Sequence, residues 1–370
     1  MAFPAIQTSE SNILSYTVGS VMGSNWWKPL TFTRNQRPLI HTNYPEQIGL
    51  NGTGECYSNL GYYVNKQKIT AGEAHIFYSH NNRSLGAFNY GVYVRNENAA
   101  GTITVTPIRK AFSTGDWHSE NDVLNAWKSD SSLPSISLAK GAGAWLCDNA
   151  CKYSTSSDAL IPFNGIIRLN TTGPLTVYCI AYRLSKKPDD SVIDQLVEFP
   201  YDSDHAIGLQ ACTGMGTGYN FQTSIDLNIG GGAGHNLSSL PFYFRVADND
   251  GANNRTDVTP IQTVNGLKTD DLGNWTCEYN FAVNIHNNTG VTQTVYGFTS
   301  SDSGRPCIYS NGHTPAGKLL EVSATQKRGS WRWFAEQVPP GTTTYEFTIC
   351  NGSYGNGCLT NAFSLSSTIV

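Results

Sequence analysis

Apolar and polar residues alternate with a period of two in many short stretches along the chain. Because successive side chains of a β-strand point to opposite faces of a sheet, this alternation predicts strands with one buried face. Clusters of Asn, Gly and Pro, which favour turns, separate the stretches. The sequence therefore predicts an all-β fold. The expected strands are residues 72–80, 87–96, 102–108, 164–170, 174–184, 219–229, 240–248, 275–287, 292–300, 330–338 and 343–350.

Two short segments carry a helical pattern instead. In residues 119–129, Val123 and Trp127 fall on one helical face behind a serine, a residue type that caps helix N-termini. Residues 189–198 follow Pro188 and predict a second short helix. We therefore expect one or two short helices beside the strands.

The length of 370 residues favours two domains of ordinary size. The second expected helix and the polar stretch 201–206 behind it mark the boundary. This gives an N-terminal domain over residues 1–204 and a C-terminal domain over residues 205–370. Many short strands with frequent turns are typical of β-sandwiches, so we expect two tandem sandwiches of the jelly-roll or immunoglobulin-like (Ig-like) type.

A short internal match favours two related domains. Residues 90–105 and 281–295 share an alternating apolar strand, an Asn-rich turn with Gly, and a Thr-rich strand. In this match Asn96 aligns with Asn287. We interpret each stretch as a hairpin, one in each sandwich.

Charge bears on the expected partners more than on the fold. Only 14% of the residues are charged, against about 25% in an average domain, and the net charge is −4. Such a chain offers no basic surface to nucleic acid or anionic lipid, and no apolar run approaches the roughly 18 residues of a spanning helix. We expect neither a nucleic-acid partner nor membrane insertion. The N-terminus does not resemble a signal peptide, so either a signal has been removed or the protein leaves the cell by another route, such as lysis.

Nine cysteines favour an oxidising exterior over the cytosol. Cys147 and Cys151 in CDNAC, and Cys350 and Cys358 around NGSYGNG, have spacings that permit local disulfides. Burial as reduced thiols is the alternative. Metal binding by CDNAC is disfavoured because no second Cys or His pair lies at a zinc-finger spacing.

One acidic stretch, DNDGANNRTD, has the oxygen donors of a calcium loop. Its candidate ligands are Asp248, Asp250, Asn253 and Asp257. The stretch lacks the spacing and the terminal Glu of an EF-hand, and an Asx-rich turn explains its composition without a metal. Calcium is therefore a candidate ligand, and we expect no other cofactor.

Signals of catalysis are sparse. In GDWHSEND, an extended backbone would place Asp116, His118 and Glu120 on one face, where they could meet a metal ion. The alternative is a loop whose carboxylates favour the N-terminus of the following helix. There is no G-x-S-x-G motif, and the glycine-rich stretches 214–220 and 230–235 are not followed by the lysine of a phosphate loop. We therefore expect no enzyme.

The aromatic content is more informative, with 19 Tyr, 15 Phe and 8 Trp. Trp26, Trp27, Trp331 and Trp333 are the candidate binding residues, because exposed tryptophans stack on sugar rings or fill subunit contacts. In SWRWF the two tryptophans share a strand face, and the alternative for this pair is a place in a sandwich core. A polysaccharide is therefore one candidate partner.

Longer stretches carry a family resemblance. Residues 75–105, with the segment 119–130, resemble the first β-domain of certain uncharacterised bacterial surface proteins, which often carry repeats named after the copper amine oxidase N-terminal domain. Residues 273–312 and 338–357, with an Asn turn and a Pro-Gly-Thr turn, are similar to the second domain of those proteins. The resemblance implies a tandem β-sandwich exported to a surface, and it implies no activity. The Asn-Tyr pairs of this chain lack the sequence context from which copper amine oxidases build their quinone.

These observations predict a non-enzymatic structural or interaction protein of a cell, spore or particle surface, assembling with copies of itself as a filament, layer or coat subunit. The alternating stretch 12–21 has one apolar face. It either completes a sheet of its own domain or joins a sheet of a neighbouring copy. The alternatives are a carbohydrate-binding surface protein and a jelly-roll virion component. The expected address is extracellular, or the virion under the last alternative.

Overall fold

The computed structural model describes most of the chain. The described residues are 10–11, 28–43, 47–48, 61–83, 86–98, 101–115, 123, 126–127, 133–154, 161–183, 187–199, 213–246, 259–263, 276–301, 307–310, 318–319, 329–350 and 359–367. Within them the chain is almost entirely β, so the all-β part of the expected fold class is confirmed. Every strand expected from alternation overlaps an observed strand. No helix in the described ranges is long and apolar enough to cross a membrane.

Contacts divide the chain into two units. Unit 1 consists of residues 1–35, 219–257 and 272–370, and unit 2 of residues 36–218 and 258–271. Each unit contains two sheets. The expected domain boundary at residues 204–205 lies outside the described residues.

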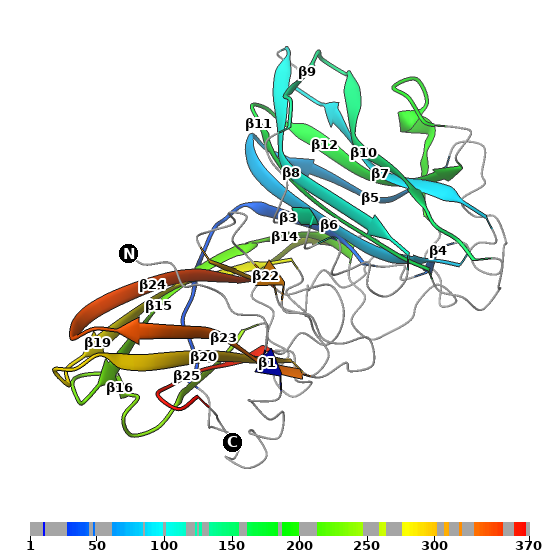
Figure 1. The fold of residues 1–370 in the computed structure, drawn as a ribbon. Coiled ribbons are helices and arrows are strands. Elements are labelled where there is room, and N and C mark those ends of the chain that lie inside the picture. Colours follow the sequence, from blue (N-terminus) through cyan, green and yellow to red (C-terminus); the bar gives the residue numbers. More distant parts are fainter. Residues whose placement is uncertain are drawn as a thin grey trace. The chain divides into compact units, whose positions relative to one another are not determined.

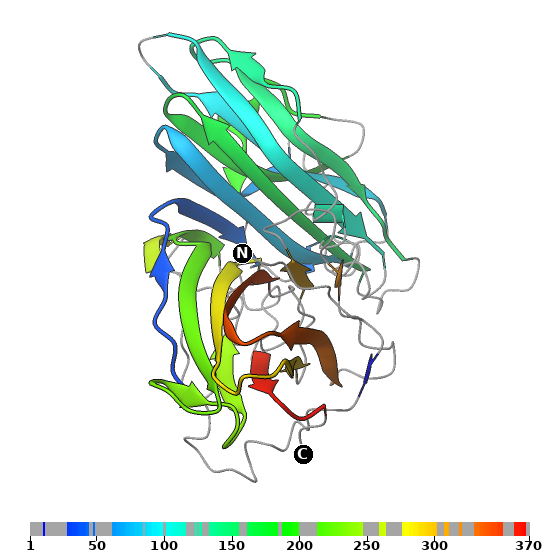
Figure 2. The same ribbon diagram turned by 60° about the vertical axis from the view of Figure 1, so that its left-hand side comes forward.

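Unit 1 contains sheets A and B, whose main strands are labelled in Figure 1. Sheet A consists, in order, of β16 (His235–Asn236), β15 (Asn220–Ile229), β19 (Glu278–Asn287), β24 (Gly341–Cys350), β21 (Cys307–Ser310) and β22 (Lys318–Leu319), with β2 (Thr33–Arg34) beside β15. Sheet B consists of β1 (Glu10–Ser11), β23 (Gly329–Val338), β20 (Gln293–Ser301), β25 (Leu359–Ser364) and β17 (Phe242–Val246). β15 (green) and β19 (yellow) run parallel and side by side in Figure 2.

Aromatic side chains from both sheets form the core of unit 1. The rings of Trp333 on β23 and Phe347 on β24 have centroids 4.7 Å apart, and those of Phe244 on β17 and Phe281 on β19 are 5.3 Å apart. All four side chains are buried. Sheets A and B therefore pack face to face as a β-sandwich.

Unit 2 contains sheets C and D. Sheet C consists, in order, of β18 (Thr259–Thr263), β14 (Thr213–Thr217), β3 (Pro38–Thr42), β6 (Gly72–Asn82), β11 (Ile161–Thr171), β8 (Ile103–Thr114) and β9 (Ile136–Leu138), with β4 (Gln47–Ile48) beside β6. Sheet D consists of β10 (Gly143–Cys151), β7 (Phe88–Asn96), β12 (Leu175–Arg183), β5 (Tyr62–Ile69) and β13 (Val197–Glu198).

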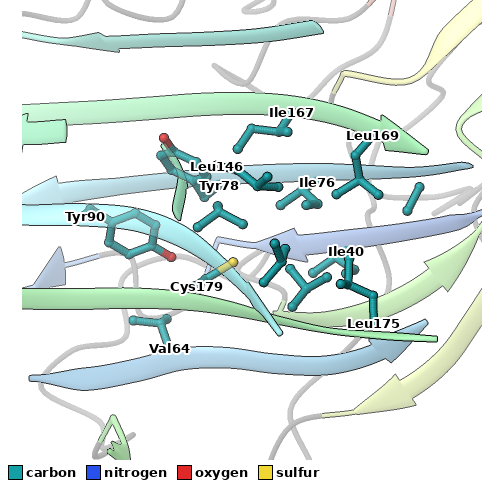
Figure 3. Close-up of a cluster of buried hydrophobic side chains, with 14 of the residues drawn as sticks. Ile40, Val64, Ile76, Tyr78, Tyr90, Leu146, Ile167, Leu169, Leu175 and Cys179 are labelled. Carbon is teal, nitrogen blue, oxygen red and sulfur yellow. The ribbon is translucent and has the colours of Figure 1, made fainter. Parts of the chain in front are cut away.

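The core of unit 2 also lies between its two sheets. Ile76 and Tyr78 of β6 point from sheet C toward Tyr90 and Cys179 of sheet D, and all four are fully buried (Figure 3). The alternation that predicted the strands places these residues on one face of each sheet. Burying a large apolar side chain contributes about 1.5–3 kcal/mol, so this shared core holds sheets C and D together.

The matched stretch in unit 2 ends in a buried asparagine. Asn96, the last residue of β7, donates from Nδ2 to the carbonyl oxygens of Gly101 and Leu138, both at 2.8 Å. Its Oδ1 accepts from the backbone N–H of Asn98 at 2.7 Å. The Asn96 side chain thus holds the turn after β7 and also holds β9, the strand that pairs with the start of β8.

Unit 1 repeats this arrangement. Asn287, the last residue of β19, donates to the carbonyl oxygens of Val291 and Val338 at 2.7 and 2.9 Å, and its Oδ1 accepts from the N–H of Thr289 at 3.0 Å. In both units the turn joins strands of different sheets, β7 to β8 and β19 to β20. The expected hairpins are therefore arches that connect the two layers of a sandwich, and the interpretation as hairpins was wrong.

The expected helices are not supported. In the segment 189–198 the structure has a turn, the single 3-10 turn η3 (Ile193–Gln195) and then β13. The side chain of Asp189 accepts from the N–H of Ser191 at 2.9 Å, which favours a local turn over a helix. Most of the segment 119–129 lies outside the described residues, although Val123 and Trp127 have helical backbone and are buried.

Candidate functional site

The sequence-predicted metal candidates fall outside the described residues. This holds for the calcium candidates Asp248, Asp250, Asn253 and Asp257, and for the cluster Asp116, His118 and Glu120. Among the residues that the structure describes, no three His, Cys, Asp or Glu side chains are grouped to hold a metal ion. Calcium binding therefore stays a prediction.

The predicted disulfide between Cys147 and Cys151 is not formed. Both residues lie on β10, opposite Val92 and Phe88 of β7. Residues four apart on a strand are about 13 Å apart, whereas a disulfide needs Cα atoms about 4.4–6.8 Å apart. The loop expected from CDNAC is a strand, which makes the bridge impossible.

The remaining predicted bridge joins Cys350 to Cys358. Cys350 is the last residue of β24 and is fully buried. Cys358 lies outside the described residues. In the core of unit 2, Cys179 is a buried thiol, and burial raises its pKa to about 12. Cys179 thus fits the alternative interpretation, in which a cysteine is a reduced thiol buried among apolar side chains.

Of the four candidate tryptophans, Trp333 can be assigned a role. It is completely buried between sheets A and B, so it is a core residue and contacts no ligand at the surface. The pairing of β20 with β23 shifts by one residue at Trp333, a bulge that breaks the simple alternation of SWRWF. Trp26 and Trp27 lie outside the described residues, and Trp331 is described in its backbone pairing with β1.

The first candidate site is the edge of sheet B at β23. One side of β23 pairs with β20 along its whole length. On the other side, β1 pairs with β23 through two residues, Glu10 opposite Arg332 and Ser11 opposite Trp331. Among the described strands, the pairing on this side covers one part of a ten-residue strand. The edge strand of a sheet can accept a strand from another chain through backbone hydrogen bonds.

The second candidate site is a hollow of about 900 Å³ on the outward face of sheet A. Its floor consists of the small residues Ser224 and Ala282, which are cross-strand neighbours on β15 and β19. Gln222, Asn280 and Glu346 occupy the adjacent outward positions. Small residues surrounded by longer side chains create the depression, which we call the sheet A hollow.

The chain segment before β2 forms one wall of the sheet A hollow. Thr31 is held there because its carbonyl oxygen accepts from Thr223 Oγ1 at 2.8 Å. Thr33 lies opposite Gln222 and donates from Oγ1 to the Gln222 carbonyl oxygen at 3.4 Å. This N-terminal segment is therefore a fixed part of the site.

A smaller hollow of about 300 Å³ lies beside an aromatic cluster on sheet D. Trp145 and Tyr93 have ring centroids 5.3 Å apart, and both contact the segment that follows Lys187. Trp145 Nε1 donates to the carbonyl oxygen of Pro188 at 3.1 Å, and the Tyr93 hydroxyl donates to Asp190. This segment occupies the polar groups of the rings, so the sheet D hollow is the weaker candidate for a ligand site.

The carboxylate of Asp148 on β10 interacts with three side chains near the sheet D hollow. It accepts from the Tyr182 hydroxyl at 2.5 Å and from Asn89 Nδ2 at 2.8 Å, and it pairs with Lys187 at 2.5 Å. Burial raises the pKa of Asp148, but the bonds from Lys187, Tyr182 and Asn89 outweigh burial and hold the pKa below its ordinary value. The charged form is thus the one that the fold stabilises.

We expect Asp148→Asn to lower the free energy of unfolding of unit 2 at pH 7 and to have a much smaller effect near pH 3. Because the pKa is lowered in the folded state, the stabilisation is present above the unfolded value of about 4 and is lost as the pH falls through the folded value. Urea unfolding at the two pH values measures this. Glu97→Gln, at an exposed position of the same unit, is the control. An equal loss at both pH values would contradict the assignment.

The comparisons with known proteins place the chain in no family. The sequence matches no family and no curated protein. Among solved structures, the CUB1-EGF-CUB2 domain of human MASP-1/3 has a TM-score of 0.16 at 7% identity, with 81% of this chain and 98% of that chain covered. Lac15 from a marine microbial metagenome has a TM-score of 0.13 at 9% identity, with 90% and 63% covered. Likenesses this low carry no argument about fold or function.

No pattern in the sequence indicates the sheet A hollow. Its polar residues are the outward half of the alternation that predicted β15, β19 and β24, and any solvated strand face has such residues. The depression depends on which positions become neighbours across three strands. That alignment is visible in the structure and not in the spacing along the chain.

Proposed function

We propose that this chain is a non-enzymatic interaction protein of a cell, spore or particle surface, and that it associates with copies of itself by strand addition at sheet B. The observation that carries the proposal is the pairing of β1 with β23. An N-terminal strand completes the edge of a sheet otherwise built from residues beyond position 240. A strand that completes a sheet of its own chain can complete the same sheet of another copy.

The physical cost of such an exchange is low. β1 gives up its backbone hydrogen bonds to β23 when it leaves its own sheet. The bonds formed in a neighbouring copy are of the same kind, and the exchange becomes favourable at high local concentration. If each copy inserts its N-terminal strand into sheet B of the next copy, the contact is heterologous. Such contacts propagate as a filament unless the rotation from one copy to the next closes a ring.

The proposed architecture is two related sandwiches in tandem, of the jelly-roll or Ig-like type. The support is a motif of four strands that both units share: β7, β8, β11 and β12 in unit 2, and β19, β20, β23 and β24 in unit 1. In each set the first and last strands pair antiparallel in one sheet, and the middle two pair antiparallel in the other. The equivalent buried residues Asn96 and Asn287 close the first arch of each set.

The proposed address is extracellular or a cell or spore surface, and a virion is the alternative. The low charge content and the resemblance to bacterial surface proteins support the first. Calcium stays a candidate ligand of residues 248–257, and a polysaccharide a candidate partner.

Deletion of residues 1–21 tests the proposal. We expect the full chain to form oligomers in light scattering coupled to size exclusion, and the truncated chain to stay folded by circular dichroism and to be monomeric. Deletion of residues 1–9, which leaves Glu10 and Ser11 in place, is the matched control and should retain assembly. A full chain that is monomeric at high concentration, or a truncated chain that still assembles, would overturn the proposal.

A further inference from the structure

The outward face of sheet A carries a track of mostly polar side chains, with two carboxylates, Asp226 and Glu346, among them. Four rows cross β15, β19 and β24 at the same register. The rows are Gln222–Asn280–Thr348, Ser224–Ala282–Glu346, Asp226–Asn284–Thr344 and Asn228–His286–Thr342. Alternate residues of a strand are about 6.8 Å apart, so four rows span about 20 Å. The sheet A hollow occupies the first two rows.

Hydrogen bonds between the rows' own members fix the side chains in place. Asn280 Nδ2 donates to Asn220 Oδ1 at 3.0 Å and to the carbonyl oxygen of Phe221 at 3.1 Å, and Asn280 Oδ1 accepts from Thr348 Oγ1 at 2.6 Å. Asn284 bridges its own row, because its Nδ2 donates to Asp226 Oδ1 at 2.9 Å and its Oδ1 accepts from Thr344 Oγ1 at 2.7 Å. A ligand that binds here therefore meets groups that are already oriented, which reduces the entropy cost of binding.

The chemistry of the hollow narrows the class of ligand. Among the described residues, its lining contains hydroxyl and amide groups, the apolar side chains of Pro29 and Leu30, and one carboxylate, Glu346, with no lysine or arginine. Without a cation the hollow does not favour phosphate, sulfate or an acidic polymer. Phe281 and Phe347 point their rings into the core, so no aromatic side chain of the lining is offered to an apolar ligand.

We propose that the sheet A hollow binds a neutral polysaccharide, with the chain of sugar residues lying along the polar track. Sugar hydroxyls are both donors and acceptors, and so are the hydroxyl and amide groups of the lining. The carboxylate of Glu346 accepts from two hydroxyls in charge-assisted bonds. A volume of about 900 Å³ is within the range of small-molecule sites and exceeds what one sugar residue requires.

This binding site is separate from the self-association at β23, because the sheet A hollow and the β1–β23 edge belong to different sheets of unit 1. Deletion of residues 1–21 removes neither the wall at Thr31 nor the floor of the hollow. The truncated chain should therefore still bind the polysaccharide. A full chain that binds the polysaccharide but does not assemble would show that only the self-association proposal fails. A full chain that assembles but does not bind it would show that only the binding proposal fails.

The test is electrophoresis of the full chain in native gels that contain dextran, xylan, mannan or laminarin, all neutral and soluble. We expect at least one to retard the protein. Ala282→Trp fills the floor of the hollow and should abolish the retardation, whereas Val291→Trp, at an exposed turn outside the hollow, should not. Glu346→Gln keeps the shape and removes the charge, and a loss of about 1–1.4 kcal/mol corresponds to roughly 5- to 10-fold weaker binding.

Two outcomes would overturn the proposal. The first is that none of the four polysaccharides retards the protein. The second is that Ala282→Trp, folded by circular dichroism, is retarded as strongly as the unmodified chain. If that variant has also lost its oligomers, the hollow is a contact between copies of the chain. Because Glu346→Gln is isosteric, it keeps the test valid if the tryptophan variant does not fold.

Discussion

Replacing Trp333 with alanine is expected to lower the free energy of unfolding of unit 1 by about 3–5 kcal/mol, a large part of the stability of a domain. Trp333 is completely buried, and its ring lies 4.7 Å from that of Phe347 and 6.2 Å from that of Phe363, between sheets A and B. Truncation removes the transfer free energy of the side chain and leaves a cavity that the two sheets cannot fill.

Urea unfolding followed by circular dichroism measures the loss, and the transition of unit 1 should move to lower urea. Tyr153→Ala, at a 47% exposed position of unit 2, is the control and should leave both transitions in place. A cost below about 1 kcal/mol would match a surface substitution and would contradict the packing of Trp333 between the sheets.

The second large effect is expected for Asn287→Ala, at about 2–4 kcal/mol. The substitution leaves the carbonyl oxygens of Val291 and Val338 without their donor, and the bond to Val338 is buried. An unsatisfied buried group costs about 1–3 kcal/mol, and the lost bond at the more exposed Val291 adds to it. Asn96→Ala should cost about the same in unit 2, because the bonds are equivalent.

Asn288→Ala is the matched control for the arch. Asn288 is exposed and its side chain makes one bond, to the carbonyl oxygen of Gly231. Thermal unfolding should place this variant close to the unmodified protein and Asn287→Ala well below it. Equal effects at Asn287 and Asn288 would show that the buried bonds do not stabilise the arch.

The strands that could be predicted are those whose alternation is simple. β19 alternates cleanly because one face lies in the core and the other outside it. β7 was also predicted, although it is buried on both faces along almost its whole length. β5 was missed because Asn65 and Gln67 are polar and yet buried. Asn65 Nδ2 donates to the carbonyl oxygens of His41 and Gly214, both at 3.0 Å, and these bonds satisfy its polar group in the interior. No pattern of apolar residues can show such a strand.

Two local motifs were misinterpreted for a related reason. CDNAC suggested a loop closed by a disulfide, but it is the end of β10, held by its pairing with β7. DDSVIDQLVE has helical spacing, yet Ile193 and Leu196 are buried against the tyrosines of sheet D, and Val197 pairs with Tyr62 of β5. In both cases tertiary pairing overrides the local preference.

The candidate sites depend on contacts between distant parts of the chain. Alternation predicted an N-terminal strand in the stretch 12–21, but this stretch lies outside the described residues. The observed β1 is Glu10–Ser11, just before the stretch. The sheet A hollow requires segments near residues 31, 224, 282 and 346 to meet. Sequence reasoning can assign such residues to strand faces, but it cannot place one strand beside another.

Trapping the exchanged strand tests self-association most directly. One chain carries Glu10→Cys and the other Arg332→Cys, at positions that are cross-strand partners. The two chains are mixed and treated with a short bismaleimide under native conditions. Strand addition between copies predicts a covalent dimer in the mixture, above the level given by either chain alone. A mixture with no more dimer than its components, while a single chain carrying both substitutions forms the crosslink within itself, would contradict it.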